Sequence, residues 1–171
     1  MVESTVFLNQ LETYFAAEKV AGLIFILFGL LAFFYAYFFF QKGSFLKGTV
    51  ISIVLVGMIQ ITVGSVVYFR TDRQVEHLKN QLVDEPQKFY AEEGTRMLGV
   101  NASFSTYFYI ELSLAIIATF LLAFGRARTM KMLAGFAAGL LIQSLLMLLL
   151  DLFARARAET YLQQIFDYFA A

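Results

Sequence analysis

The chain has 171 residues, of which 60% are hydrophobic and 15% are charged, and its formal net charge is zero. This composition is typical of an integral membrane protein and leaves no basic cluster that would bind nucleic acid. The chain has no cysteine and a single histidine, His77, which excludes disulfides, thiol catalysis and Cys-based or multi-His metal sites within one chain. We therefore expect no metal and no other cofactor.

Four segments are long and apolar enough to cross a hydrocarbon core of roughly 30 Å at about 1.5 Å per helical residue. These predicted spans cover about residues 20–40, 48–69, 104–124 and 132–153. The first three contain no Lys or Arg. Nearly all remaining residues lie in segments 1–19, 70–103 and 154–171, which we call the head.

The head also has a helical pattern, because its apolar residues recur every three or four positions. Pro86 interrupts the chain and suits the first turn of a new helix. We predict four helices over about 4–40, 46–83, 86–124 and 130–169. Their head segments are expected to pack on one another through Leu11, Val75, Leu78, Leu82, Met97, Val100, Leu162 and Ile165.

The predicted fold is a single all-α domain: a four-span antiparallel bundle whose long helices extend beyond the bilayer on the side of both termini. The short turns between the helices favour antiparallel neighbours. An alternative is that the terminal amphipathic segments bend and lie flat in the headgroup region. Two ion pairs at i,i+4 spacing are expected, Glu92 with Arg96 and Asp151 with Arg155.

The two turns opposite the head carry five basic residues and no acidic residue: Lys42, Lys47, Arg126, Arg128 and Lys131. Positively charged turns remain in the cytoplasm. We therefore expect an integral protein of a bacterial inner (plasma) membrane, with both termini and the head extracytoplasmic.

Glu111 is an acidic residue in the middle of the third span. Glu111, Gln60 and Gln143 are each separated by a similar number of residues from the nearest basic turn. The three side chains are therefore expected to lie at one depth and to form an intramembrane polar layer. A structural interpretation makes Glu111 a neutral hydrogen-bonding group that fixes the packing of the helices. A functional interpretation makes it a site for a proton or a cationic ligand group, as intramembrane carboxyls often are.

Charged residues also gather where the second and fourth spans meet the head. We predict an interfacial charged ring formed by Arg70, Asp72, Arg73, Asp151, Arg155 and Arg157. Ion pairs and arginines that extend to the interface account for most of this pattern. Binding of an anionic lipid headgroup is the alternative.

Glycines mark positions where two helices can approach closely. Gly57 and Gly64 lie two turns apart in the second span, and Gly135 and Gly139 form a G-x-x-x-G motif in the fourth. Packing within one chain is one interpretation. Contact with a second copy of the chain or with another membrane protein is the other.

The preferred functional hypothesis is an accessory or structural membrane subunit that acts through helix–helix contacts, with membrane lipids and a membrane protein as its partners. The alternative is a small oligomeric carrier or proton-linked transporter that uses Glu111. An enzyme acting on lipid is the least favoured, since the chain shows no nucleotide loop and no nucleophile beside a base. No family motif is recognisable.

Overall fold

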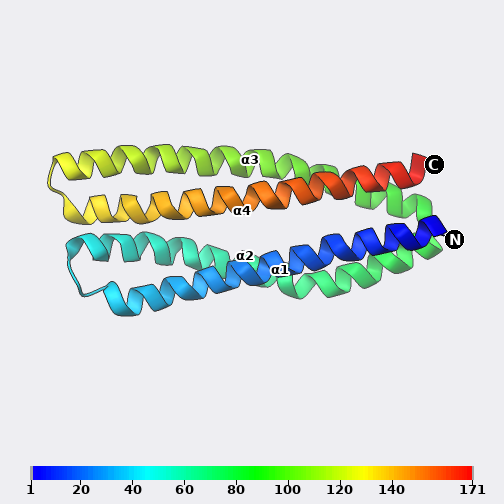
Figure 1. The fold of residues 1–171 in the computed structure, drawn as a ribbon, viewed down its shortest axis with the longest axis horizontal. Coiled ribbons are helices and arrows are strands. Elements are labelled where there is room, and N and C mark those ends of the chain that lie inside the picture. The colour runs from blue at the N-terminus through cyan, green and yellow to red at the C-terminus, as the bar shows by residue number, and fades with distance from the viewer. Residues whose placement is uncertain (1, 171) are drawn as a thin grey trace.

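The computed structural model describes residues 2–170, with side chains from residue 5 onward, and this part of the chain is helical apart from short turns, with no strand (Figure 1). Its four helices are α1 (Val2–Phe39), α2 (Ser44–Asp84), α3 (Pro86–Ala127) and α4 (Lys131–Ala170). Each helix is long and apolar enough to cross a membrane. The predicted all-helical class, with four long apolar helices, is confirmed.

The helices run from the turns into the head without interruption. The terminal segments continue α1 and α4 as unbroken helices and pack in the head, which favours a projecting head over terminal segments that bend and lie flat. Pro86 is the first residue of α3, as predicted. Gly43 precedes α2 with a φ of 134°, a conformation that side-chain-bearing residues rarely adopt. Both termini lie at the end of the molecule opposite the α1–α2 and α3–α4 turns (Figure 1).

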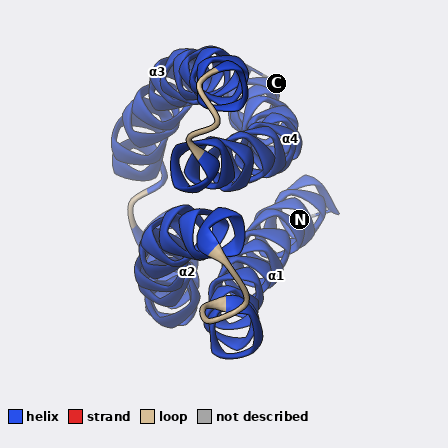
Figure 2. Cartoon of the chain, turned by 90° about the vertical axis from the view of Figure 1, so that its left-hand side faces the viewer, coloured by secondary structure: helices blue, strands red, loops and turns tan. Residues whose placement is uncertain are grey.

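The half of the molecule near these turns is a row of helices in the order α1, α2, α4, α3 (Figure 2). Close helix contacts there join α1 to α2, α2 to α4, and α4 to α3. Within residues 2–170, no Cα atom of α1 lies within 8 Å of a Cα atom of α3. The outer helices α1 and α3 therefore form the two edges of an open row.

The head, in contrast, closes around a shared hydrophobic core. The Phe7 ring of α1 meets the Phe89 ring of α3 edge-on and stacks on the Tyr168 ring of α4, with centroids 5.9 and 4.5 Å away. All eight residues predicted to pack in the head belong to this core or lie against it. Aromatic side chains thus join α1 to α3 and α4 in the head, whereas α1 lies apart from both in the half near the turns (Figure 2).

The α1–α2 hairpin and the α3–α4 hairpin share a pattern of buried residues. Buried positions on α2 and α4 recur at a constant sequence separation in six pairs: Gly48 and Gly135, Val50 and Ala137, Ser52 and Gly139, Gly57 and Ser144, Thr71 and Ala158, and Leu78 and Ile165. The two hairpins are therefore built alike, with α2 and α4 as the central helices.

Candidate functional site

The predicted polar layer is divided between two helix interfaces. Gln60 Nε2 donates a hydrogen bond to Gln143 Oε1 at 3.3 Å, and both side chains are buried between α2 and α4. Glu111 is also buried, but it faces α4 from the other side, beside Asp151. Because α4 lies between α2 and α3 in the row, the Glu111 side chain on α3 meets α4 and does not reach Gln60 on α2.

The Glu111 and Asp151 carboxyl groups interact across the α3–α4 interface. The cavity beside them has a volume of about 10 Å³ and is lined by Arg155 and by apolar side chains, among them Phe108 and Leu148. A cavity of this size accommodates about one water molecule. Glu111 Oε2 is buried and has no hydrogen-bond partner in the described part of the chain. The site is therefore a pair of acids beside a small cavity.

The two hairpins differ at this site. By the sequence separation that relates α2 to α4, the counterpart of Asp151 is Gly64, which lies 2.5–3.0 Å, as measured from an ideal Cβ, from backbone and side-chain atoms of α1. The α1–α2 hairpin thus closes with a glycine where the α3–α4 hairpin contains a carboxyl group. Packing of a hairpin of this design does not require an acid at that position.

Both predicted i,i+4 ion pairs are wrong. Arg155 Nε contacts Glu159 Oε1 at 2.7 Å, while Asp151 faces Glu111. The Glu93 side chain is buried in the head, and Arg96 donates two hydrogen bonds to it, of 2.6 and 2.7 Å. Arg96 therefore pairs with Glu93 and not with Glu92. Glu92 instead accepts a hydrogen bond from the Gln81 side chain on α2 at 2.6 Å.

Two members of the predicted charged ring pair with α1, which the sequence analysis did not include in the ring. Arg70 contacts Glu18 at 2.9 Å, and Asp72 contacts Lys19 at 2.6 Å. The hydrogen bond from Lys19 to Asp72 raises the pKa of the Lys19 ammonium. The signal was present, since Glu18 and Lys19 directly precede the first span as Arg70 and Asp72 directly follow the second. Arg73 is exposed and forms no ion pair among the described residues.

The glycines singled out in the sequence all face another helix of the same chain. Gly57 and Gly64 contact α1 at Ala32 and Gly22, and Gly139 contacts α2 at Thr49. A Cβ atom at Gly135 would collide with the Phe45 carbonyl oxygen. These close approaches leave the glycine faces no room for a partner helix.

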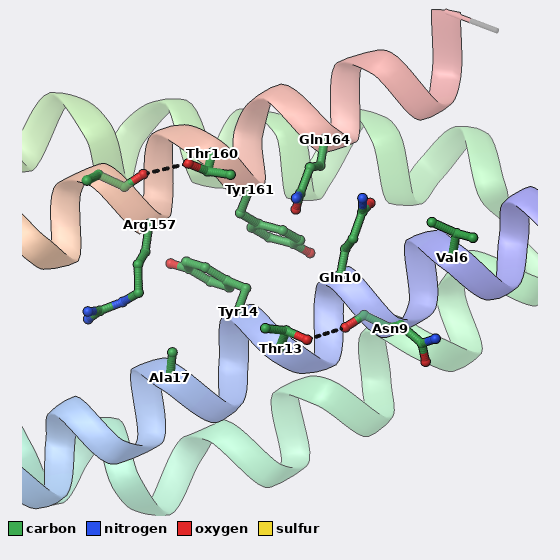
Figure 3. Close-up of a pocket in the computed structure, with 11 residues that line it drawn as sticks. Val6, Asn9, Gln10, Thr13, Tyr14, Ala17, Arg157, Thr160, Tyr161 and Gln164 are labelled. Carbon is green, nitrogen blue, oxygen red and sulfur yellow. Dashed lines mark hydrogen bonds between the residues drawn. The ribbon is translucent and has the colours of Figure 1, made fainter.

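A groove in the head lies between α1 and α4 and has a volume of about 510 Å³ (Figure 3). The stacked rings of Tyr14 and Tyr161 lie along it (Figure 3). Burial raises the pKa of both tyrosines, and the neighbouring carboxylates Glu18 and Glu93 add to this effect at Tyr14 and Tyr161 respectively. The polar lining of the groove consists of Asn9, Gln10, Thr13, Arg157, Thr160 and Gln164.

Sequence reasoning did not identify the groove, although it placed Arg157 in the charged ring. The groove depends on how α1 and α4 separate, and no local sequence pattern encodes that distance.

Comparison with protein-family models, with characterised proteins and with solved structures gives no match to this chain. Functional proposals therefore depend on the residues and their geometry.

Proposed function

We propose that the protein is an accessory or structural subunit of a bacterial inner membrane that acts through helix–helix contacts. Its four helices cross the bilayer in an antiparallel arrangement, and the head and both termini are extracytoplasmic. The basic turns at Lys42, Lys47, Arg126, Arg128 and Lys131 support this orientation. The partner is either a second copy of the chain or another membrane protein.

The open row of helices is the observation that carries the proposal. Its edge helices present large apolar side chains on their outer faces, such as Phe34 on α1 and Phe120 on α3, which are 64% and 75% exposed. In a closed bundle, α1 and α3 would pack on each other, and each would cover part of the other's surface. An open row instead offers two long faces on which a further membrane helix can pack through van der Waals contact.

The interior of the row supports a role without chemistry. Gln60 and Gln143 bond to each other, and the cavity at Glu111 is too small for a substrate. The polar groups of the spans therefore act mainly in packing.

Site-specific photo-crosslinking in intact membranes tests this proposal. A photoreactive phenylalanine analogue is introduced at Phe34 or Phe120, and at Tyr35 as a matched control. Tyr35 neighbours Phe34 but points toward α2, where its hydroxyl lies 3.1 Å from Thr49 Oγ1. We expect a discrete protein adduct from at least one edge and no intermolecular adduct from position 35. Lipid adducts alone at both edges would contradict the proposal.

A second candidate is a small oligomeric carrier or proton-linked transporter that uses Glu111. The observation that favours it is the acid pair of Glu111 and Asp151, which stands where the α1–α2 hairpin packs through Gly64. A group that packing does not require is a candidate for function. A proton held between the two carboxyls would be the transported or coupling species.

Infrared spectroscopy distinguishes the two candidates. A carrier requires the acid pair to exchange its proton with water, so the carboxyl band that disappears in Glu111→Gln would shift within seconds of transfer into D₂O. A structural pair beside a cavity that accommodates about one water molecule exchanges far more slowly, and this is the result we expect. The Glu111→Gln variant should then unfold within about 1 kcal/mol of the wild type, because glutamine retains a hydrogen-bonding group of the same shape.

A further inference from the structure

Arg157 stands out among the basic residues of the head. Six of the others form ion pairs: Lys19, Arg70, Lys79, Lys88, Arg96 and Arg155. Arg73 and Arg157 form none within the described residues, and of these two only Arg157 is partly buried. Its guanidinium lies at one end of the groove between α1 and α4, beside Tyr14 and Ala17 (Figure 3). A partly buried guanidinium without a carboxylate favours an anionic ligand.

The rest of the groove is uncharged: its surface is mostly apolar, with Val6, Ala17 and Ala156 among its lining residues, and polar side chains are placed along it. Asn9, Gln10, Thr13, Thr160 and Gln164 supply amides and hydroxyls, and no Asp or Glu lines the groove. The Gln10 and Gln164 side chains extend toward one another from α1 and α4 (Figure 3). The Thr13 and Thr160 hydroxyls donate to backbone carbonyls of their own helices and can accept from a ligand, whereas the amides can both donate and accept. This combination suits the hydroxyl groups of a ligand. A volume of about 510 Å³ exceeds what a bare phosphate ion would fill.

The position of the groove relates it to the membrane surface. Arg157 follows the end of the fourth predicted span at residue 153 by about one helical turn, and Ala17 precedes the first span by a similar distance. The end of the groove at Arg157 is thus the end nearest the bilayer. Gln10 and Gln164 lie farther out, toward the termini (Figures 1 and 3).

We infer that this groove binds the headgroup of an anionic phospholipid whose phosphate carries a hydroxylated substituent, as in phosphatidylglycerol. The phosphate lies beside Arg157 at the level of the lipid headgroups. The hydroxylated substituent extends along the groove toward Gln10 and Gln164. This inference rests on the membrane insertion proposed above, and it gives the head a specific lipid contact in addition to its helix contacts.

The charge of the lining explains the expected selectivity. In the same orientation, the ammonium of phosphatidylethanolamine would extend toward Gln10 and Gln164, where no carboxylate lines the groove, so a zwitterionic headgroup is disfavoured. Phosphatidic acid supplies the phosphate but no hydroxylated substituent for Gln10 and Gln164. The recognised chemistry, a phosphate with a polyol, also occurs in soluble glycerol phosphate, and the test below separates this source from the lipid.

Native mass spectrometry of the full-length protein in detergent tests the inference. Phosphatidylglycerol, phosphatidylethanolamine and phosphatidic acid with identical acyl chains are titrated separately. We expect phosphatidylglycerol to bind about tenfold more tightly than phosphatidylethanolamine, because the groove offers no carboxylate to the ammonium and a charged group without a partner costs binding free energy of this size. Arg157→Gln should lower phosphatidylglycerol affinity by a similar factor.

Two further variants make the test specific. Arg73→Gln removes the same charge from an exposed position outside the groove and should change affinity by less than about twofold. Gln10→Met keeps the charge and the approximate shape, and it should lower the preference for phosphatidylglycerol over phosphatidic acid. Thermal unfolding of each variant in detergent verifies that it is folded.

Three results would overturn the inference: equal affinity for phosphatidylglycerol and phosphatidylethanolamine, equal losses in Arg157→Gln and Arg73→Gln, or displacement of the lipid by an equal concentration of glycerol phosphate. The last result would assign the groove to a soluble ligand. A protein adduct at the row edges together with any of these results would refute only the inference that the groove binds a phospholipid headgroup. Specific lipid binding without a protein adduct would refute only the subunit proposal.

Discussion

The ring of Tyr14 on α1 stacks on the ring of Tyr161 on α4, with their centroids 4.3 Å apart and their planes 8° from parallel. The pair joins the first and last helices of the chain in the head. In the half near the turns, α1 and α4 lie apart, separated by α2 in the row (Figure 2). The tyrosine pair therefore helps to close the head and forms one wall of the groove (Figure 3).

Stability of the head should depend on tyrosine ionisation at alkaline pH. Burial raises the pKa of Tyr161 above its unfolded value of about 10, so its contribution is complete below that pH and is lost as pH rises further. We expect the thermal unfolding temperature in detergent to fall above about pH 10. Tyr161→Phe should reduce that fall and remain within about 1 kcal/mol of wild type at pH 8. An identical alkaline fall in both proteins would contradict this.

The Glu93–Arg96 pair should be important for head stability. The Glu93 side chain is 1% exposed and accepts two hydrogen bonds from Arg96, whose guanidinium also lies over the Phe15 ring. Arg96→Leu leaves a buried carboxylate without its partner, and we expect destabilisation of about 3 kcal/mol. The double variant Glu93→Leu, Arg96→Leu should recover at least half of this loss in denaturant unfolding. A double variant less stable than Arg96→Leu would argue against an unpaired charge as the cause.

The contact between the two hairpins should depend on Gly135. Gly135→Ala places a methyl group against the Phe45 carbonyl oxygen, which forces α2 and α4 apart, so we expect destabilisation of about 1 to 3 kcal/mol. Gly99→Ala is the matched control, since a Cβ there meets no atom within 4 Å. The control should be neutral or slightly stabilising, because alanine favours a helix more than glycine does. Thermal unfolding of the two variants in detergent makes the comparison.

The sequence predicts the helices and the head core well because both follow from local periodicity. Leu78, Met97 and Ile165 could be assigned to one core because each lies on the apolar stripe of its own helix. Pro86 similarly fixed the start of α3. Features that depend on one helix alone could thus be predicted from the sequence.

The order of the helices in the row could not be predicted from the sequence. Gln60, Glu111 and Gln143 were predicted to share one layer from their depths, but depth does not determine which helix a side chain faces. With α4 between α2 and α3, Gln143 faces Gln60, while Asp151, farther along α4, faces Glu111. The predicted pairing of Asp151 with Arg155 failed for the same reason, since spacing along one helix does not reveal a competing partner on another.

The central claim is that the helices cross a membrane and leave the head outside. The chain has no cysteine, so single cysteines can be introduced without further changes. Ser44, Asn80 and Thr129 are exposed and suit this purpose: Asn80 lies in the head, and the other two lie at the turns.

The most direct measurement is labelling of these cysteines in intact cells with a membrane-impermeant thiol reagent. We predict that position 80 reacts, whereas positions 44 and 129 react only after the membrane is permeabilised. Labelling at the turns with protection at position 80 would place the head in the cytoplasm. Equal labelling at all three positions in intact cells would contradict the claim that a bilayer separates the head from the turns.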